Sequence, residues 1–490
     1  MTDLKEKLRD YVETFNAGDE ECYVQAVPNA QAYAWLAEQI PLLECPDTAL
    51  EETYYFRWWT FRKHWKETAD GHIVTEFLPA VQWAGPHNSI NCATCHHIRE
   101  GRWLRDDAGW MREYMRFWLE GKGDALSYSM WLASAVEDYC TLRGDETFAQ
   151  ACLEPLTALY ERREAQSLRA CGLFWSDDDR DGMEYSISGP GLRPTLNAYM
   201  YGDAAAIARI AARGRRADLA CIYRAKAERL EAAIERLLWD GDFYRTLPCG
   251  RDEQPDGAER PPVAPEHRVR ELIGYLPWYF GLAKPDHEAA FAQLMQPNGF
   301  LAPWGLTTAE QRHPRFMFCH EHECLWNGPV WPFATAQTLT AAARLLRESP
   351  ETDAFTREDY YVLLRQYALA HRLRDGTQRF KPWIDEDMDP YTGEWIARAS
   401  LKADRWNPKR GGYERGKDYN HSTFCDLVLD GLLGIHTDVQ GHLCVDPLTP
   451  DSWPWFRVEG IRAAGQMWTV LYDRDGSRYG CGPGIHVLEQ

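Results

Sequence analysis

Apolar side chains recur three or four positions apart through most of the 490-residue chain. This spacing is typical of helices with one buried face. Eight segments share it and are predicted as helices: 124–144, 145–166, 193–214, 216–241, 269–283, 329–348, 356–373 and 419–435. Pro194 stands early in segment 193–214, and Gly144, Gly214 and Gly241 each stand at the end of a segment, as expected where helices start and stop.

The connections between these helices are of two kinds. Gly144 and Gly214 leave room only for short turns, whereas other connections are long and rich in Gly, Pro, Trp and Asp. Helical hairpins joined at one end by tight turns and at the other by long loops suggest a ring or solenoid. No fixed repeat of about 34 or 40 residues is present, which argues against the common repeat arrays.

The pattern changes near residue 440. Beyond it, short alternating runs such as WTVLYD are broken by Gly, Pro and Asp, which predicts strands. We therefore expect a mainly α body over residues 1–440 and a small β-rich C-terminal segment over 441–490 packed on it. The polar, Pro-rich stretch 249–268 is interpreted as an exposed excursion, not a domain boundary.

Composition narrows the class of protein. The chain is 45% hydrophobic and has a net charge of −20, so it can bury a large core and is expected to repel nucleic acid and anionic membranes. No run approaches 18 apolar residues, and the start, MTDLKEKLRDYVETF, lacks the apolar stretch of a secretory signal. We expect a cytoplasmic protein whose fourteen cysteines are reduced and mostly packed as small apolar groups.

The segment CATCHH begins at Cys92 and contains the C-x-x-C-H spacing of covalent haem attachment. A single match in a long chain is weak evidence, because the spacing arises easily by chance. Zinc on Cys92, Cys95, His96 and His97 is a second interpretation, but no further Cys/His pair lies nearby in the sequence. We favour packing roles for the two cysteines and expect neither a metal nor an organic cofactor.

The 21 Trp and 24 Tyr residues are the most informative excess. Many of them stand beside Gly, Pro and charged residues, as in YYFRWWTFRKHW and KPWIDEDMDPYTGEW. Flat rings mixed with carboxylates, Arg and Asn are typical of sugar sites, since rings stack on sugar faces while polar groups bind hydroxyls. A large core that simply uses many aromatics is the alternative.

Two acidic loops, 174–191 and 380–395, could supply catalytic carboxylates. Cleavage of a glycosidic bond requires an acid that protonates the leaving oxygen and a second carboxylate on the opposite face. In inverting enzymes the two carboxyls stand about 6.5–9.5 Å apart, because a water molecule lies between the sugar and the base. A solvated loop and, for the first segment, a calcium site are the alternatives, although the EF-hand spacing is absent.

Four ordered motifs resemble the (α/α)6-barrel glycosidases of the clan that holds glycoside hydrolase families 63 and 37 and the mannosylglycerate hydrolases. They are DGMEYS (181–186), LLWDGDFYRT (237–246), LWNGPVWPF (325–333) and IDEDMDPYTG (384–393). The resemblance covers about residues 50–440. It implies an (α/α)6 toroid and an inverting exo-α-glycosidase that acts on a small α-glucoside or α-mannoside, without a cofactor, and it allows a homo-oligomer.

The resemblance assigns roles by position. Glu386 falls on the base of the family and Glu184 on its acid, although the family has Asp at that position. Asp181 is the alternative acid, because the environment decides which carboxyl keeps its proton. Trp175 and Tyr185 are expected to desolvate the acid. Further substrate-binding candidates are Arg57, Trp58, His96, His97, Arg102, Trp103, Asp106, Trp304, Trp326, Asn327, Trp331 and His421.

Other functions remain open at this point. α-L-Rhamnosidases, unsaturated-uronyl hydrolases, phosphorylases and epimerases share the (α/α)6 architecture, and a fold does not determine a reaction. A non-catalytic sugar-binding barrel is the alternative outside enzymes, and the Glu at 184 is the feature that favours it. The expected partner is a small glycoside, with no nucleic acid and no membrane.

Overall fold

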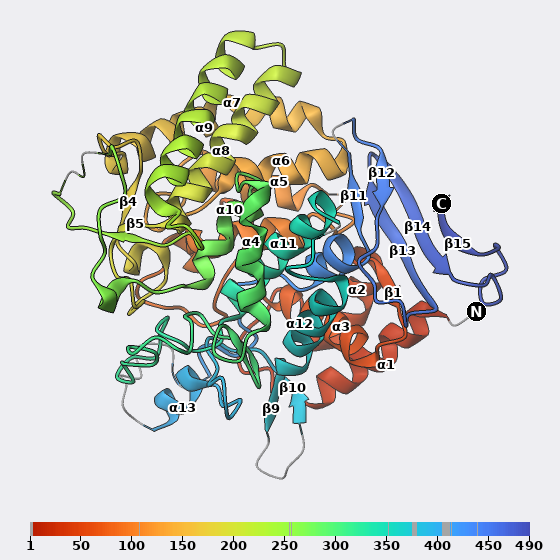
Figure 1. Ribbon diagram of the computed structural model, residues 1–490. Coiled ribbons are helices and arrows are strands. Elements are labelled where there is room, and N and C mark those ends of the chain that lie inside the picture. The colour runs from red at the N-terminus through yellow and green to blue at the C-terminus, as the bar shows by residue number, and fades with distance from the viewer. Residues whose placement is uncertain are drawn as a thin grey trace.

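Six helical elements form an inner ring in the computed structural model (Figure 1). They are α4 (Asn91–Gly101), α6 (Leu132–Arg143), α8 (Pro194–Arg213), α10 (Leu276–Tyr279), α11 (Pro332–Glu348) and the π-helical element η8 (Leu427–Leu432). Each packs on the next. Arg102, after the end of α4, closes the ring through ion pairs with Asp426 and Asp430. The predicted mainly α toroid is therefore confirmed.

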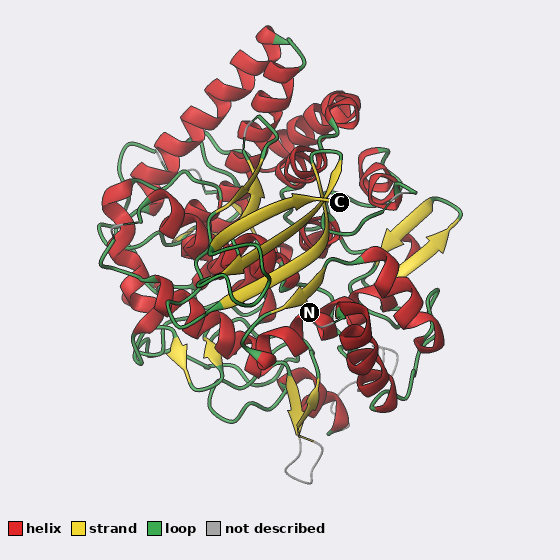
Figure 2. Cartoon of the chain, turned by 90° about the vertical axis from the view of Figure 1, so that its right-hand side faces the viewer, coloured by secondary structure: helices red, strands yellow, loops and turns green. Residues whose placement is uncertain are grey.

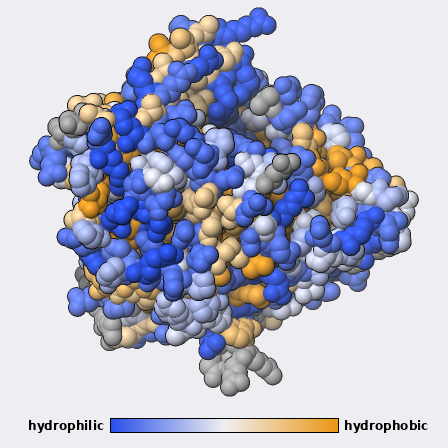
Figure 3. Space-filling model, in the orientation of Figure 1, coloured by the Kyte–Doolittle hydropathy of each residue, from blue (hydrophilic) through white to orange (hydrophobic). Residues whose placement is uncertain are grey.

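The structure describes residues 3–106, 108–253, 255, 257–350, 352–374, 380–403, 412, 414–438 and 440–490. No helix within these ranges is both long and apolar enough to cross a membrane. On the face shown in Figure 3, hydrophilic residues predominate and hydrophobic ones form scattered patches.

An outer layer covers the ring. It includes α5 (Trp110–Leu119), α7 (Glu146–Ser167), α9 (Ala217–Leu238) and α12 (Arg357–Ala370). These helices have one buried stripe and one exposed face, so their periodicity is visible in the sequence. On α9, for example, Tyr223, Ala227, Leu230 and Ile234 are buried. The predicted helices 145–166, 216–241 and 356–373 correspond to three of these four elements.

Helix α3 (Thr48–Lys63) corrects one interpretation of the sequence. The aromatic run YYFRWWTFRKHW, whose mixture of rings and charges resembles a loop, is helical up to Lys63 and buried. α1 (Leu4–Ala17), α2 (Ala32–Gln39) and α12 pack against α3. A helix covered on every side has no polar stripe, so its sequence shows no helical period.

The C-terminal segment forms an antiparallel sheet, as predicted (Figure 2). Its strands are β13 (Trp455–Ala463), β14 (Gln466–Asp473) and β15 (Gly484–Glu489). A fourth strand, β1 (Leu42–Glu44), pairs with β13 in the register Leu43 to Val458. The sheet thus includes one strand from the helical part of the chain. This strand connects the helical part to the C-terminal segment.

The remaining elements are short and lie mostly in the long loops. They are β2 (Trp65–Thr68), β3 (Gly71–Val74), β4 (Trp175–Ser176), β5 (Gly191–Leu192), β6 (Leu247–Pro248), β7 (Leu301–Ala302), β8 (Gly305–Leu306), β9 (Arg372–Arg374), β10 (Phe380–Pro382), β11 (Ile435–Thr437), β12 (Leu443–Val445), α13 (Ile396–Lys402), η1 (Asn29–Gln31), η2 (Pro86–Asn88), η3 (Asp179–Asp181), η4 (Pro265–His267), η5 (Leu272–Tyr275) and η6 (Pro285–Met295).

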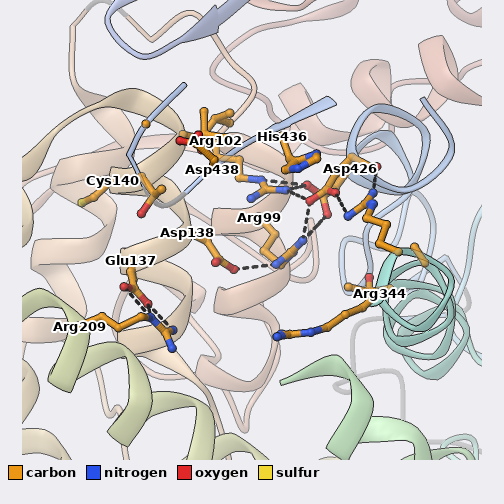
Figure 4. Close-up of a pocket in the computed structure, with 18 of the residues that line it drawn as sticks. Arg99, Arg102, Glu137, Asp138, Cys140, Arg209, Arg344, Asp426, His436 and Asp438 are labelled. Carbon is orange, nitrogen blue, oxygen red and sulfur yellow. Dashed lines mark hydrogen bonds and ion pairs between the residues drawn. The ribbon is translucent and has the colours of Figure 1, made fainter. Parts of the chain in front are cut away.

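The ring has two chemically different ends. We call the end where α4, α8 and α11 begin the N-terminal mouth, and the end where they finish the C-terminal mouth. A cavity of about 310 Å³ lies at the N-terminal mouth. A second cavity, of about 820 Å³, lies at the C-terminal mouth (Figure 4).

Candidate active site

Glu184 and Glu386 line the same cavity at the N-terminal mouth, although they lie 202 positions apart in the sequence. Glu184 lies in the loop before α8, and Glu386 lies in the loop after β10. The full lining is Glu76, Phe77, Trp83, Ile90, Cys92, Tyr128, Asp179, Arg180, Gly182, Glu184, His322, Glu323, Cys324, Trp331, Glu386, Arg415, Tyr419 and His421.

A buried arginine holds Glu386 in place. Arg415 donates to Oε1 of Glu386 from Nη2 at 2.5 Å and from Nε at 2.8 Å, and from Nη1 to Glu323 at 3.0 Å. Its guanidinium also lies 5.2 Å from the Trp83 ring centroid. A cation fixed in this way favours the ionised form of a neighbouring carboxyl, which is the form a general base needs.

The loop that carries Glu386 is braced by its neighbours. Asp385 accepts a hydrogen bond from the backbone N–H of Glu386 at 2.9 Å. Burial and the charge of Glu386 raise the pKa of Asp385 to about 7. Gly393, with φ +74°, lies so close to the Trp304 ring that a side chain at 393 would collide with it. Trp304 therefore supports the loop and does not line the cavity.

Glu184 has the environment of an acid. Burial raises its pKa to about 7, and the charges of Asp179 and Glu386 add to the shift. The thiol of Cys324 donates to Oε2 of Glu184 at 2.8 Å, which opposes the shift by stabilising the carboxylate. A carboxyl with a pKa near neutrality remains partly protonated around pH 7 and can deliver its proton.

Asp181, the alternative acid, lies outside the cavity lining. Its oxygens accept hydrogen bonds from Ser129 at 2.6 Å, Ser176 at 2.6 Å and Arg193 at 2.6 Å. Both side chains of the Asp181–Arg193 ion pair are fully buried. This geometry is that of a residue that shapes the loop, since both oxygens of Asp181 are engaged by the protein and neither belongs to the cavity wall.

The two aromatic residues expected to desolvate the acid do not do so directly. Trp175 donates from Nε1 to the carbonyl of Cys249 at 3.0 Å, and Tyr185 is 45% exposed beside the His322 ring. Neither lines the cavity. The side chain found in contact with the Glu184 carboxyl is that of Cys324.

Two of the predicted substrate-binding residues, Trp331 and His421, line the cavity. Trp326 stacks on Trp331 with ring centroids 4.8 Å apart, one layer behind the lining. Asn327 donates to the carbonyl of Cys319 at 3.1 Å and holds the same loop. The WNGPVW segment therefore presents one aromatic ring to the cavity and uses its other polar and aromatic groups to position it.

Three further candidates lie at the opposite mouth. Arg102 and Trp103 both donate to Oδ1 of Asp426, at 2.6 and 2.8 Å. Figure 4 shows Arg102 and Asp426 at the C-terminal cavity. Asp106 accepts from the backbone N–H groups of Trp110 and Met111, at 2.7 and 3.0 Å, and so caps α5. Since α4 starts at the N-terminal mouth, the residues just beyond its end cannot reach the cavity there.

The last four candidates pack within the helical body. Arg57 donates to the carbonyl of Ser422 at 2.6 Å, and Trp58 is fully buried in α3. His96 lies between the rings of Trp131 and Phe333, with centroids 5.0 and 4.4 Å away. The fourth, His97, bonds the backbone carbonyl of residue 420 at 2.6 Å.

The sequence analysis missed several lining residues. Glu76, Glu323, Cys324 and Arg415 had no motif around them that we interpreted, and Cys92 was assigned to packing. Their position in the chain was a usable signal. Each of them lies in a long loop before an inner helix or in the first turn of such a helix. The loop before η8, which carries Arg415 and Tyr419, is the clearest example.

A helical ring with two carboxylates in different environments across one mouth defines the class of (α/α)6 glycosidases. Comparison of the chain with known protein families agrees with this class. Residues 85–422 match the mannosylglycerate hydrolase MGH1-like glycoside hydrolase domain, and the chain belongs to this glycoside hydrolase family. Among curated proteins, no sequence matches the chain.

Solved structures resemble this chain at two levels of sequence identity. One, named "Sialidase", is 36% identical, covers 99% of this chain with a TM-score of 0.88, and has 43% of its own length covered. This chain thus spans less than half of that relative. A family 63 mannosylglycerate hydrolase from Thermus thermophilus, in complex with Tris and D-glycerate, is 13% identical with a TM-score of 0.51. The match covers 77% of this chain and 100% of that hydrolase. An α-L-rhamnosidase from Aspergillus terreus is 12% identical, with coverages of 92% and 50% and a TM-score of 0.53.

Proposed function

We propose that this glycoside hydrolase is an inverting, exo-acting α-glycosidase that cleaves a small α-glucoside or α-mannoside. Glu184 acts as the general acid and Glu386 as the general base. The observation that carries the proposal is that both carboxyls line one cavity in opposite environments. One is buried beside a thiol, and the other contacts a buried guanidinium.

The reaction follows from these environments. The proton of Glu184 passes to the glycosidic oxygen as the bond to the anomeric carbon breaks. The Glu386 carboxylate takes a proton from a water molecule, which attacks the opposite face of the sugar. The product therefore has the inverted anomeric configuration. Arg415 keeps Glu386 oriented and ionised between turnovers.

The size of the cavity favours a small substrate. Its volume of about 310 Å³ lies at the lower end of the range of about 300–1,000 Å³ that is usual for ligand cavities. Trp331 offers a flat face for a sugar ring, and Asp179, Arg180 and Glu323 offer polar groups for hydroxyls. The mannosylglycerate hydrolase description of the family supports a small mannoside as one of the two substrate classes.

A panel of aryl glycosides tests the proposal. We expect hydrolysis of an α-glucoside or α-mannoside, and proton NMR should show the β-anomer of the free sugar first. The panel includes an α-L-rhamnoside and an α-sialoside. Preferred turnover of either would replace the proposed substrate class, first appearance of the α-anomer would contradict inversion, and dependence on inorganic phosphate would indicate a phosphorylase.

A further inference from the structure

Three different metal-ligating side chains meet in the wall of the same cavity. Glu76 precedes α4, Cys92 lies in its first turn, and His421 precedes η8. One potential ligand atom from each of them lies within 4.8 Å of those of the other two, and all three side chains are buried. They also line the cavity, so a group bound by them would face the substrate space.

Two of the three separations between the ligand atoms are close to those of a tetrahedral ion. Zinc bonds of about 2.3 Å to sulfur and about 2.0–2.2 Å to nitrogen and oxygen place tetrahedral ligand atoms about 3.4–3.6 Å apart. Sγ of Cys92 lies 3.5 Å from Nε2 of His421 and 3.9 Å from Oε2 of Glu76. Both distances are near the tetrahedral value. Both are also longer than a strong hydrogen bond between nitrogen or oxygen atoms.

Tyr419 orients the imidazole for this role. Its hydroxyl donates to Oε1 of Glu76 at 2.7 Å and contacts Nδ1 of His421. A hydroxyl whose proton points at a carboxylate accepts from Nδ1–H, which leaves the lone pair of Nε2 directed at Cys92. A partner on the far ring nitrogen that fixes the tautomer is the usual second sphere of a metal-bound histidine.

We propose that Glu76, Cys92 and His421 bind a divalent transition-metal ion of the zinc type, with its fourth position open to the cavity. Three protein ligands of mixed O, S and N character with one open position are typical of sites that bind water or a substrate. The inference goes beyond the proposed hydrolysis and does not depend on it.

Metal binding would change the charge of the cavity wall. A bound divalent cation would stabilise the carboxylate of Glu76 and the thiolate of Cys92, so protons on these groups would be released to solvent on binding.

Of the C-x-x-C-H pattern, only Cys92 contributes a ligand to the proposed metal site. Cys92 faces the cavity, whereas Cys95 lies one turn further along α4 and is fully buried away from it. His96 and His97 are occupied with ring packing and with the carbonyl of residue 420. The remaining ligands come from Glu76 and His421, which no local sequence spacing connects with Cys92.

Metal titration of the full chain tests the site directly. The apo protein is titrated with Zn²⁺ and with Co²⁺, and bound metal is counted after gel filtration. We expect one tight ion per chain, a cobalt–thiolate charge-transfer band in the near ultraviolet, and release of close to two protons per ion near pH 7. Affinity should rise with pH, because protons compete with the metal.

Matched cysteine variants identify the ligand. Cys92→Ala should abolish the charge-transfer band and lower the affinity at least 100-fold, whereas Cys95→Ala, one turn away on the same helix, should leave both unchanged. Cys92→Ser keeps the volume of the side chain and should also lose the band, so a folding defect cannot mimic the result. Tyr419→Phe should lower the affinity about 10–100-fold.

The proposal is overturned if the wild type retains no stoichiometric ion, if the band survives in Cys92→Ala, or if Cys95→Ala loses it equally. Metal content and the cobalt spectrum are read without any glycoside. A failure of hydrolysis in the aryl-glycoside panel therefore leaves this result intact, and a failure of metal binding leaves the acid–base pair intact.

Discussion

The two mouths of the ring use charge in opposite ways. At the C-terminal mouth, Arg99, Arg102 and Arg347 surround Asp426 and Asp430 in ion pairs. Figure 4 shows Arg99, Arg102 and Asp426 of this cluster. Burial alone would raise the pKa of Asp430, but the neighbouring arginines hold it well below its usual range. At the N-terminal mouth, Arg415 pairs with Glu386 and Glu323, but two other carboxyls have no such cation in the part of the chain that the structure describes. Burial raises the pKa values of these two, Glu76 and Glu184, to about 8 and about 7.

The difference shows which end braces the barrel and which end is available for chemistry. Cations at the last turns of α4 and α11 also offset the negative ends of the helix dipoles. Carboxyls at the other end keep protons near neutral pH, which costs stability but provides an acid. Substitutions at one mouth should therefore lower the reaction rate, and substitutions at the other should lower the free energy of unfolding.

The largest effect is expected for Glu386→Gln. Loss of the base should lower kcat by about 10³- to 10⁴-fold, because a neutral amide cannot take a proton from water. Arg415 loses one of its two buried partners and keeps Glu323, so some stability should be lost as well. Steady-state hydrolysis of the best aryl glycoside is therefore measured at a temperature at which the variant is folded. Full activity in a folded Glu386→Gln enzyme would remove this residue from the mechanism.

Asp426→Asn should show the converse behaviour. The carboxylate accepts hydrogen bonds from Arg99, Arg102 and Trp103, so its loss leaves buried guanidinium charge uncompensated. We expect a loss of about 3–5 kcal/mol in the free energy of unfolding in urea. The kcat of the folded enzyme should stay within about twofold, well below the 10²-fold that loss of a catalytic group would produce.

Asp438→Asn is the matched control at the same mouth. Asp438 accepts hydrogen bonds from Gln440 and His442 in its own loop and has no ion pair with an arginine among those found in the described residues. Its substitution should leave the free energy of unfolding almost unchanged. An equal loss of stability in both variants would contradict the bracing role of the Asp426 network.

Asp106→Ala should separate the two roles considered for this residue. As a cap of α5, Asp106 contributes about 1 kcal/mol to stability and nothing to substrate binding. Urea unfolding should show that loss, while KM stays constant. A rise in KM without loss of stability would restore the sugar-binding role that the resemblance implied.

The smallest effect is a shift in the pH profile. Activity should fall as pH rises through about 7, because Glu184 then loses the proton it must donate. Removing the thiol donor in Cys324→Ala should raise the pKa of Glu184, so the alkaline limb of kcat/KM should move upward by about half a pH unit. Cys324→Ser keeps a donor and should move the limb less. A downward shift in Cys324→Ala would contradict the assigned hydrogen bond.

Sequence patterns predicted the parts of the fold that have a polar side. Outer helices such as α7, α9 and α12 have an exposed face, so their sequences showed the helical period. α3 and α4 did not, since they are covered on all sides and their sequences contain no polar stripe. Arg57, Trp58 and His96 lie on these two helices and were predicted to bind substrate. Buried helices that contain many aromatic and basic residues have sequences similar to those of loops.

The candidate site was predicted only where a local motif marked it. The acidic loops identified Glu184 and Glu386, and the structure brings them together. Glu76, Glu323, Cys324 and Arg415 meet them through the closure of the ring, a contact between segments far apart in the chain that no local spacing encodes. Only the three-dimensional arrangement distinguishes Asp181, held by Arg193 and two serines, from Glu184.

The dependence on leaving group in two variants tests the acid–base assignment most directly. Glycosyl fluoride needs little protonation to depart, whereas a phenyl glycoside needs an acid. We predict that Glu184→Gln keeps most of its activity on the α-glycosyl fluoride but loses at least 10²-fold on the phenyl α-glycoside, while Glu386→Gln loses both. Equal losses on the two substrates in Glu184→Gln, or survival of fluoride hydrolysis in Glu386→Gln, would contradict the pairing of these carboxyls across the cavity.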